Sequence, residues 1–278
     1  MIAPVYPIAD WDDAYANSAH IRDGAAYPGR WAARAAAFRD LLASAGRARI
    51  DLAYGPAPRN RLDLFYPQDR SKGLVVFVHG GFWKAFDKST WSHLAEGPLG
   101  AGYAVAMPSY PLCPDARIGE ITRAIAATIE YAAAAVQGEI ALCGHSAGGH
   151  LVTRMICRSS PLSEATASRI ARTMSISGLH DLRPLMATAM NDALRIDQEE
   201  ANRESPALLA PLPHQRVLCW AGADERPEFL RQNRILADMW RGFDARMTVV
   251  EEAGRHHYNV IDGLTTTEHP LTQALVAS

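Results

Sequence analysis

The sequence has little net charge, few cysteines and no long apolar run. Its 278 residues include 28 basic and 30 acidic side chains, for a formal net charge of −2 at pH 7. A nearly neutral chain produces no strong overall field, so we expect neither nucleic acid nor a membrane surface as a partner. No stretch approaches the roughly 18 consecutive apolar residues of a membrane span. Because the first residues also lack the basic and apolar segments of a secretory signal, we expect a cytoplasmic protein.

The usual sequence patterns of metal and disulfide chemistry are also absent. The four cysteines lie far apart, at Cys113, Cys143, Cys157 and Cys219. Three of them stand in apolar runs, where a cysteine behaves as a small hydrophobic residue. There is no CxxC pair and no HExxH sequence, so we predict free thiols in the core and no metal or other cofactor. We expect a small-molecule substrate, and a homodimer stays open as the assembly.

Short apolar runs and helical patterns alternate through most of the chain, of which 48% is hydrophobic. Runs that are apolar on both faces are typical of a parallel sheet covered by helices. We predict strands at residues 74–78, 103–107, 139–143, 173–177, 217–221 and 247–250, and helices at 118–136, 147–158 and 229–240. This alternation predicts a doubly wound α/β sheet with helices on both faces, in a single domain of residues 1–278.

Two segments differ from this pattern. In residues 1–60, Trp31, Ala35, Phe38 and Leu42 recur at helical spacing, and we predict an N-terminal arm and helix followed by leading antiparallel strands. Residues 61–66 alternate like an edge strand. Residues 179–214 contain many prolines and no clear strand, so we predict a short cap over the carboxyl edge of the sheet, where ligands of open α/β sheets bind.

A nucleophile motif follows the third of the six predicted strands. It reads Gly144-His145-Ser146-Ala147-Gly148-Gly149-His150 and fits the pattern Gly-x-Ser-x-Gly. A sharp turn from strand to helix leaves no room for side chains beside the serine, which explains the flanking glycines. The turn would present the Ser146 hydroxyl at the amino terminus of a helix, where the amide of Ala147 can donate to a developing oxyanion.

A second glycine motif, His79-Gly80-Gly81-Phe82-Trp83, follows the first of these strands. Glycines let backbone amides approach a substrate oxygen, so Gly81 or Phe82 is predicted to supply the second oxyanion donor. We predict that His79 and His145 hold these loops through hydrogen bonds. Two such motifs in this order, each after a strand, favour a site for acyl transfer over two ordinary turns.

A serine nucleophile needs a histidine base and a carboxylate that orients it, in the chain order Ser, Asp or Glu, His. Asp224 is the favoured acid because it is the first carboxylate after the turn glycine that follows residues 217–221. Glu225, Glu228 and Asp181 are the alternatives. The base is His256 or His257, and the residues alone do not choose between these neighbours.

Beyond the motifs, the chain resembles the kynurenine formamidase (arylformamidase) family of the α/β-hydrolase superfamily over about residues 51–264. The segments that carry the resemblance are 79–83, 144–151, 177–185, Asn191, 204–206 and 227–232. The resemblance implies hydrolysis of N-formyl-L-kynurenine to formate and kynurenine, part of tryptophan catabolism, without a metal. It selects His257 as the base, since the family's histidine precedes an aromatic residue, here Tyr258 in place of the more usual phenylalanine. Trp83 and Tyr258 are the expected substrate contacts, with core packing as the equal alternative for Phe82 and Trp83.

Two other hypotheses for the function compete with this one. A carboxylesterase for small acyl esters would use the same nucleophile, base and acid. A noncatalytic binding protein could also be built on a hydrolase scaffold, but such proteins typically lose one of the three residue types, and this chain retains all of them in order.

Overall fold

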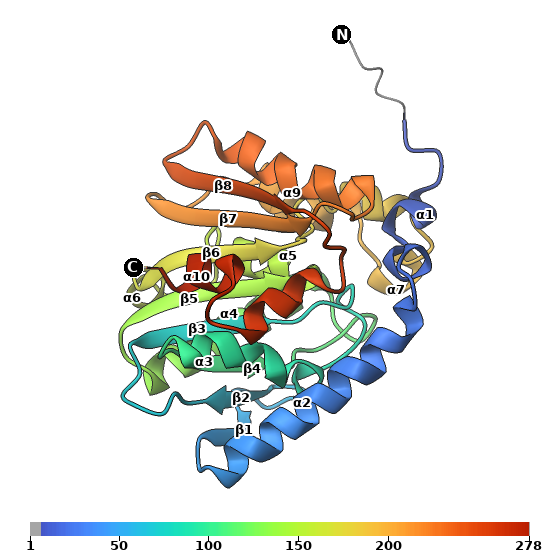
Figure 1. Ribbon diagram of the computed structural model, residues 1–278. Helices are drawn as coiled ribbons and strands as arrows, with labels where there is room; N and C mark the ends of the chain where they lie inside the picture. The colour runs from blue at the N-terminus through green and yellow to red at the C-terminus, as the bar shows by residue number, and fades with distance from the viewer. Residues whose placement is uncertain (1–6, 278) are drawn as a thin grey trace.

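The computed structural model describes residues 7–277, which form an eight-stranded sheet with the order β1-β2-β4-β3-β5-β6-β7-β8 (Figure 1). The strands are β1 (Ala48–Ala53), β2 (Arg61–Phe65), β3 (Gly73–Val78), β4 (Ala104–Pro108), β5 (Glu139–His145), β6 (Ile170–Ile176), β7 (Gln215–Gly222) and β8 (Ala245–Glu252). All six predicted parallel strands are present, as β3 to β8. The predicted mostly parallel α/β sheet is therefore confirmed.

The two leading strands are antiparallel, as predicted, but β2 is not the edge. It lies between β1 and β4 and is hydrogen-bonded to both. Asp63, a polar residue of its alternating pattern, is fully buried, and its carboxylate contacts Lys88 Nζ at 2.7 Å. The expectation of an edge strand was wrong because this ion pair makes a charged position compatible with an interior strand.

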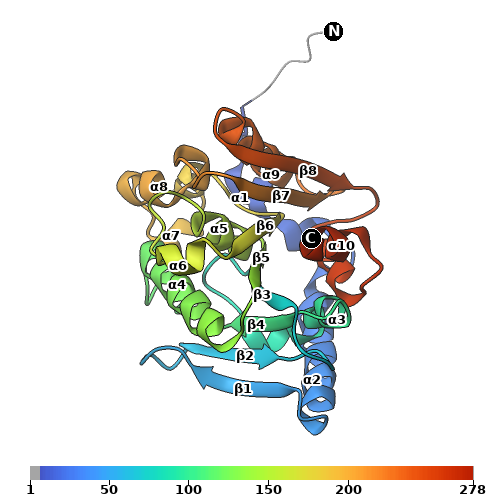
Figure 2. The same ribbon diagram turned by 90° about the vertical axis from the view of Figure 1, so that its left-hand side faces the viewer.

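Helices cover both faces of the sheet (Figure 2). The pair α4 (Ile118–Ala135) and α5 (Ala147–Arg154) covers one face together with α9 (Pro227–Trp240), and the opposite face carries α2 (Tyr27–Ser44), α3 (Glu96–Gly100) and α10 (Pro270–Val276). The predicted helices are present, although α5 ends before the expected Arg158. The shorter helices are α1 (Trp11–Tyr15), α6 (Glu164–Ala167), α7 (Asn191–Leu194) and α8 (Gln198–Glu204). Among the helices of residues 7–277, none combines the length and apolar character needed to span a bilayer.

The strands between these helix layers contribute to two separate cores. In β3, Leu74, Val76 and Val78 pack toward α4 and α5, whereas Val75 and Phe77 pack toward α2, α3 and α10. Successive side chains of a strand point to opposite faces, so a strand covered on both sides must be apolar throughout. A sheet held from both sides in this way fixes the positions of the loops at its carboxyl edge.

Candidate active site

Ser146 lies at the sharp turn between β5 and α5 with a strained backbone, at φ 54° and ψ −118°. A side chain on either flanking glycine would collide with backbone. A Cβ at Gly148 would lie 1.9 Å from the carbonyl oxygen of Val78, and one at Gly144 would lie 2.1 Å from the carbonyl oxygen of Gly148. The turn is also tied to the neighbouring strand, because the Ser146 amide donates to the Ile176 carbonyl at 2.8 Å. Strain of this kind is retained where the surrounding structure enforces it, as at a nucleophile.

The loop after β3 supplies free backbone amides beside this serine. Gly81, Phe82 and Trp83 all have positive φ, at 112°, 48° and 55°. Within residues 7–277, the amides of Gly81, Phe82 and Ala147 meet no hydrogen-bond acceptor. Gly81, Phe82 and Ser146 line one pocket, and Ala147 follows directly at the first position of α5. Unpaired amides grouped around a nucleophile can stabilise a developing oxyanion.

The carboxylate that meets the histidine is Glu225, not Asp224. Its Oε2 lies 2.7 Å from His257 Nδ1, while Oε1 accepts from the Ser177 hydroxyl at 2.5 Å and from the Gly222 amide at 2.8 Å. The Glu225 side chain is fully buried, whereas Asp224 is exposed. The expectation for Asp224 was wrong because a tight turn, closed by the Glu225 amide on the Gly222 carbonyl, points the first carboxylate outward.

The other two candidate carboxylates have different partners. Asp181 pairs with the guanidinium of Arg183 at 2.9 Å. Glu228 accepts two hydrogen bonds from Arg231, both at 2.7 Å. Neither carboxylate is therefore free to orient a histidine in the pocket.

The neighbouring histidines point in different directions, and His257 is the one that lines the pocket. His257 is buried, faces Glu225 through Nδ1 and lines the pocket with Ser146, so Nε2 is the atom left to accept a proton. His256 instead lies 3.2 Å from the Tyr27 hydroxyl through Nε2. The structure thus brings Ser146, Glu225 and His257 to one edge of the sheet, after β5, β7 and β8.

Two further histidines hold the loops, as predicted. His145 Nε2 donates to the His257 carbonyl at 2.9 Å, and His79 Nδ1 donates to the Gly80 carbonyl at 2.7 Å. Burial lowers the pKa of His79 to about 4. Burial, together with the nearby His257, lowers the pKa of His145 well below its usual value. Both imidazoles are therefore neutral near pH 7, and each has a fixed donor nitrogen.

Of the two expected substrate contacts, Tyr258 lines the pocket and Trp83 does not. Trp83 is fully buried, and its indole nitrogen donates to His150 Nδ1 at 3.2 Å. This hydrogen bond ties the loop after β3 to α5. Trp83 therefore lies in the core, as the packing alternative predicts, and not in the wall of the pocket.

The pocket at Ser146 has a cavity volume of about 70 Å³, and much of its wall is aromatic. Its lining residues are Asn17, Trp31, Gly81, Phe82, Phe86, Trp91, His145, Ser146, His257 and Tyr258. The residues 179–214, where a cap was predicted, are not among those that line this pocket. The pocket is covered instead by the N-terminal arm (residues 7–26), α2 and residues 86–91. This cover was not predicted from the sequence. The signal for it was the number of aromatic residues that follow the loop at 79–83.

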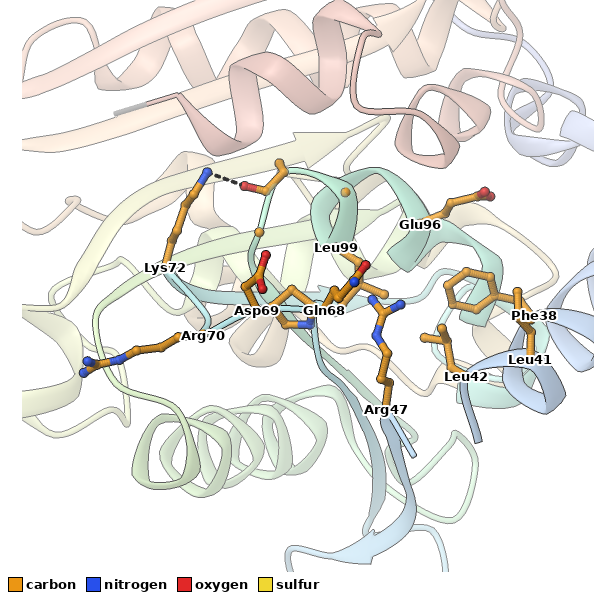
Figure 3. A pocket seen from close by; sticks show the side chains of 14 residues that line it. Phe38, Leu41, Leu42, Arg47, Gln68, Asp69, Arg70, Lys72, Glu96 and Leu99 are labelled. Carbon is orange, nitrogen blue, oxygen red and sulfur yellow. Dashed lines mark hydrogen bonds between the residues drawn. The ribbon is translucent and has the colours of Figure 1, made fainter. Parts of the chain in front are cut away.

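A larger hollow of about 520 Å³ lies away from this chemistry (Figure 3). Its lining includes Phe38, Leu42, Arg47 and Lys72, and Lys72 Nζ donates to the Ala101 carbonyl at 2.8 Å. Since Lys72 immediately precedes β3, the hollow belongs to the amino edge of the parallel strands, opposite to Ser146. Within residues 7–277, no group of three or more His, Cys, Asp or Glu side chains is arranged to hold a metal ion.

Known proteins resemble this chain over most of its length. Kynurenine formamidases from Danio rerio and Salmo salar are each 26% identical to it, over 90% and 82% of this chain and over 92% and 80% of their own lengths. These matches confirm the predicted resemblance to that family. A crystal structure from Silicibacter sp. TM1040, described provisionally as a thioesterase, is 48% identical with a TM-score of 0.90, over 96% of this chain and 98% of that one.

The sequence model of the alpha/beta hydrolase family matches residues 75–276, which include the loop after β3, the turn at Ser146, Glu225 and His257. The sheet order and the site at its carboxyl edge agree with this match. The chain is therefore a hydrolase by fold and by similarity, and it belongs to the alpha/beta hydrolase family.

Proposed function

We propose that the chain is a serine hydrolase that cleaves the formamide bond of N-formyl-L-kynurenine or a similar aryl formamide. The observation that carries the proposal is the aromatic pocket of about 70 Å³ at Ser146. Ligand pockets typically measure about 300–1,000 Å³, so this one favours a very small acyl group at the nucleophile. Formyl is the smallest acyl group, and aromatic walls suit an arylamine leaving group. Similarity to kynurenine formamidases supports the same choice.

In the proposed mechanism, Ser146 Oγ attacks the formyl carbon while His257 Nε2 takes the hydroxyl proton. Glu225 stabilises the resulting imidazolium through Nδ1, and the amides of Ala147 and of Gly81 or Phe82 bind the oxyanion. The C–N bond then breaks as His257 returns the proton to the arylamine nitrogen, which is a poor leaving group as an anion. Water, deprotonated by His257, attacks the formyl ester, and formate leaves as Ser146 regains its proton.

Formate release from N-formylkynurenine by the purified protein tests the proposal. We expect turnover that falls about a thousandfold or more in Ser146→Ala, because that variant lacks the nucleophile. We also expect the N-acetyl analogue to react at least tenfold more slowly than the formyl substrate. Negligible formate release by a folded protein that hydrolyses simple esters would overturn the formamidase proposal and favour a carboxylesterase.

A thioesterase is the second candidate, because the 48% identical relative is provisionally described as one. A thioester would pass through the same acyl-serine steps with a thiolate as leaving group. Measuring kcat/KM for a formamide and an acyl thioester on one preparation separates the two activities. If a fluorophosphonate probe fails to label Ser146 in folded protein, both enzyme proposals give way to a noncatalytic binding protein.

A further inference from the structure

Asn17 brings an unpaired side-chain nitrogen, Nδ2, into the Ser146 pocket from a distant part of the sequence. It is the first residue of a short 3-10 helix, η1 (Asn17–His20), within the N-terminal arm. Ser18, Ala19 and His20 are exposed, whereas Asn17 is 5% exposed and lines the pocket. Its Nδ2 is buried and meets no acceptor among the described residues. A buried donor without a partner destabilises a fold by about 1–3 kcal/mol, so its retention in a pocket indicates a ligand.

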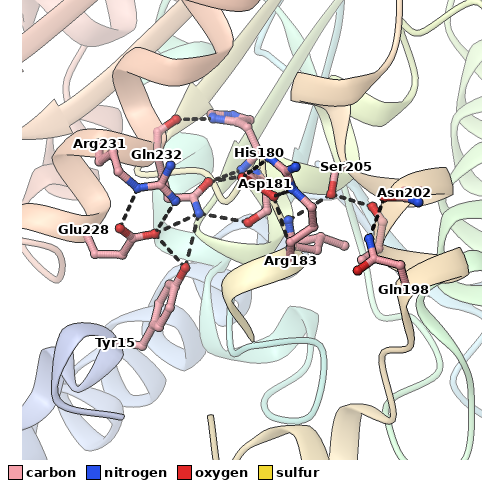
Figure 4. A network of polar contacts seen from close by, with 12 residues as sticks. Tyr15, His180, Asp181, Arg183, Gln198, Asn202, Ser205, Glu228, Arg231 and Gln232 are labelled. Carbon is pink, nitrogen blue, oxygen red and sulfur yellow. Dashed lines mark hydrogen bonds and ion pairs between the residues drawn. The ribbon is translucent and has the colours of Figure 1, made fainter. Parts of the chain in front are cut away.

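A buried polar cluster fixes the arm just before Asn17 (Figure 4). The hydroxyl of Tyr15 donates to Glu228 Oε1 at 2.7 Å and accepts from Gln232 Nε2 at 3.2 Å. Glu228 is held in turn by the guanidinium of Arg231. All of these partners belong to α9, and Tyr15 is 2% exposed. The arm is therefore anchored to the main body two residues away from Asn17.

The same anchor places the arm beside the loop after β3 and beside α9. The ring of Tyr15 packs edge-on against Phe82 and Phe229, with centroids 6.5 Å and 5.8 Å away. The ring of Phe229 in turn packs against the imidazole of His257, with ring centroids 4.4 Å apart. Because the outer side of η1 is exposed and Asn17 faces inward, Asn17 covers the pocket on the side away from the sheet.

We propose that Asn17 is a substrate-positioning residue whose Nδ2 donates to an oxygen on the leaving-group side of the substrate. The acyl carbon must lie at Ser146, so the leaving group extends outward to the cover that Asn17 belongs to. The preferred substrates are then amides or esters whose leaving group carries a carbonyl or carboxylate oxygen near the scissile bond. This inference rests on the proposed acyl-transfer chemistry, but not on the formyl group itself.

Two pairs of probes test the inference. The ester pair is phenyl acetate and 2-acetylphenyl acetate, and the formamide pair is formanilide and 2-acetylformanilide. In each pair only the second member carries a carbonyl oxygen on its leaving group. The measured quantity is the ratio of kcat/KM within a pair, compared between wild type and variant, so that differences in intrinsic reactivity cancel.

We expect Asn17→Ala and the size-matched Asn17→Leu to lower this ratio about tenfold, the effect of one hydrogen bond. Thermal unfolding of Asn17→Leu should occur at or above the wild-type temperature, since the lost donor has no partner in the free protein. A residue kept for folding alone would instead lower the unfolding temperature and leave the ratio unchanged. Asn202→Ala, which removes an exposed amide from α8, is the matched control and should change neither quantity.

Three other results separate the two proposals. An unchanged ratio in both Asn17 variants would overturn the positioning role. An equal loss on both members of a pair would assign Asn17 to the oxyanion and would overturn the leaving-group contact. If neither formamide reacts but the ester ratio falls, the formamidase proposal fails and the role of Asn17 stands.

Discussion

The floor and the cover of the Ser146 pocket are built by different means. The floor consists of residues 79–83 and 144–150, two short segments at the ends of neighbouring strands. The cover consists of Asn17, Trp31, Phe86 and Trp91, which come from the arm, α2 and a loop. Glycines and strained backbone angles define the floor locally, whereas the cover exists only because distant segments pack together. We therefore expect the floor to determine the chemistry and the cover to determine the choice of substrate.

Removing the negative charge of Glu225, which faces His257, has the largest expected effect. Glu225→Gln keeps the size of the side chain but cannot stabilise the imidazolium that forms on His257, so kcat/KM should fall about 10³- to 10⁴-fold. Asp224→Asn changes an exposed neighbour and should stay within twofold of wild type. Kinetics on any reactive acyl substrate measures both variants. Equal losses in the two would show that Glu225 is not the orienting acid.

Lowering the pH should reduce the stability of the protein, because two histidines of the floor are buried in their neutral form. Burial lowers the pKa of His79 to about 4 and that of His150 to about 3, against about 6.5 in the unfolded chain. The unfolded state binds these protons first, so the stabilisation is complete above pH 6.5 and is lost as the pH falls from 6.5 toward 4 and 3. Each histidine should contribute a slope of about 1.4 kcal/mol per pH unit in that window.

Denaturant unfolding between pH 7.5 and 4.5 measures this slope. In His79→Gln the slope should be about 1.4 kcal/mol per pH unit smaller than in wild type, because unfolding then takes up one proton fewer. The control Gln137→Ala removes an exposed side chain that does not titrate and should leave the slope as it is. A free energy of unfolding that is constant over this range would contradict neutral buried histidines in the floor.

Loosening the cover should have the smallest effect. Tyr15→Phe removes the hydroxyl that donates to Glu228, which should lower the free energy of unfolding by about 1–3 kcal/mol. Because the arm then holds Asn17 less firmly, KM for an acceptor-bearing substrate should rise severalfold and by a larger factor than kcat falls. Steady-state kinetics gives both constants. Tyr131→Phe, on α4, is the matched control. An identical kinetic change in that variant would show that the arm has no specific effect on substrate binding.

Much of the floor can be predicted from the sequence because its determinants are local. Residues 144–148 specify a turn from strand to helix, since side chains at Gly144 and Gly148 would collide with backbone. The apolar runs of β3 to β8 identify a buried parallel sheet, because strands covered on both faces have no polar side. Strand order then brings the segments after β5, β7 and β8 to one edge. For the base, the residues alone left two neighbours open, and the family resemblance selected His257.

The acid, the direction of Trp83 and the cover required the tertiary structure. Asp224 and Glu225 are neighbours of the same chemical class, and only the path of the turn decides which one faces His257. Trp83 follows a glycine loop, yet it is fully buried and its indole nitrogen donates to His150. Asn17 reaches Ser146 across 129 positions of the sequence because Tyr15 is anchored on α9. The sequence by itself determined the sheet and the turn that carries Ser146, since periodicity and steric exclusion act between near neighbours. Side-chain direction and long-range contacts decided the rest, because they depend on the packing of the whole chain.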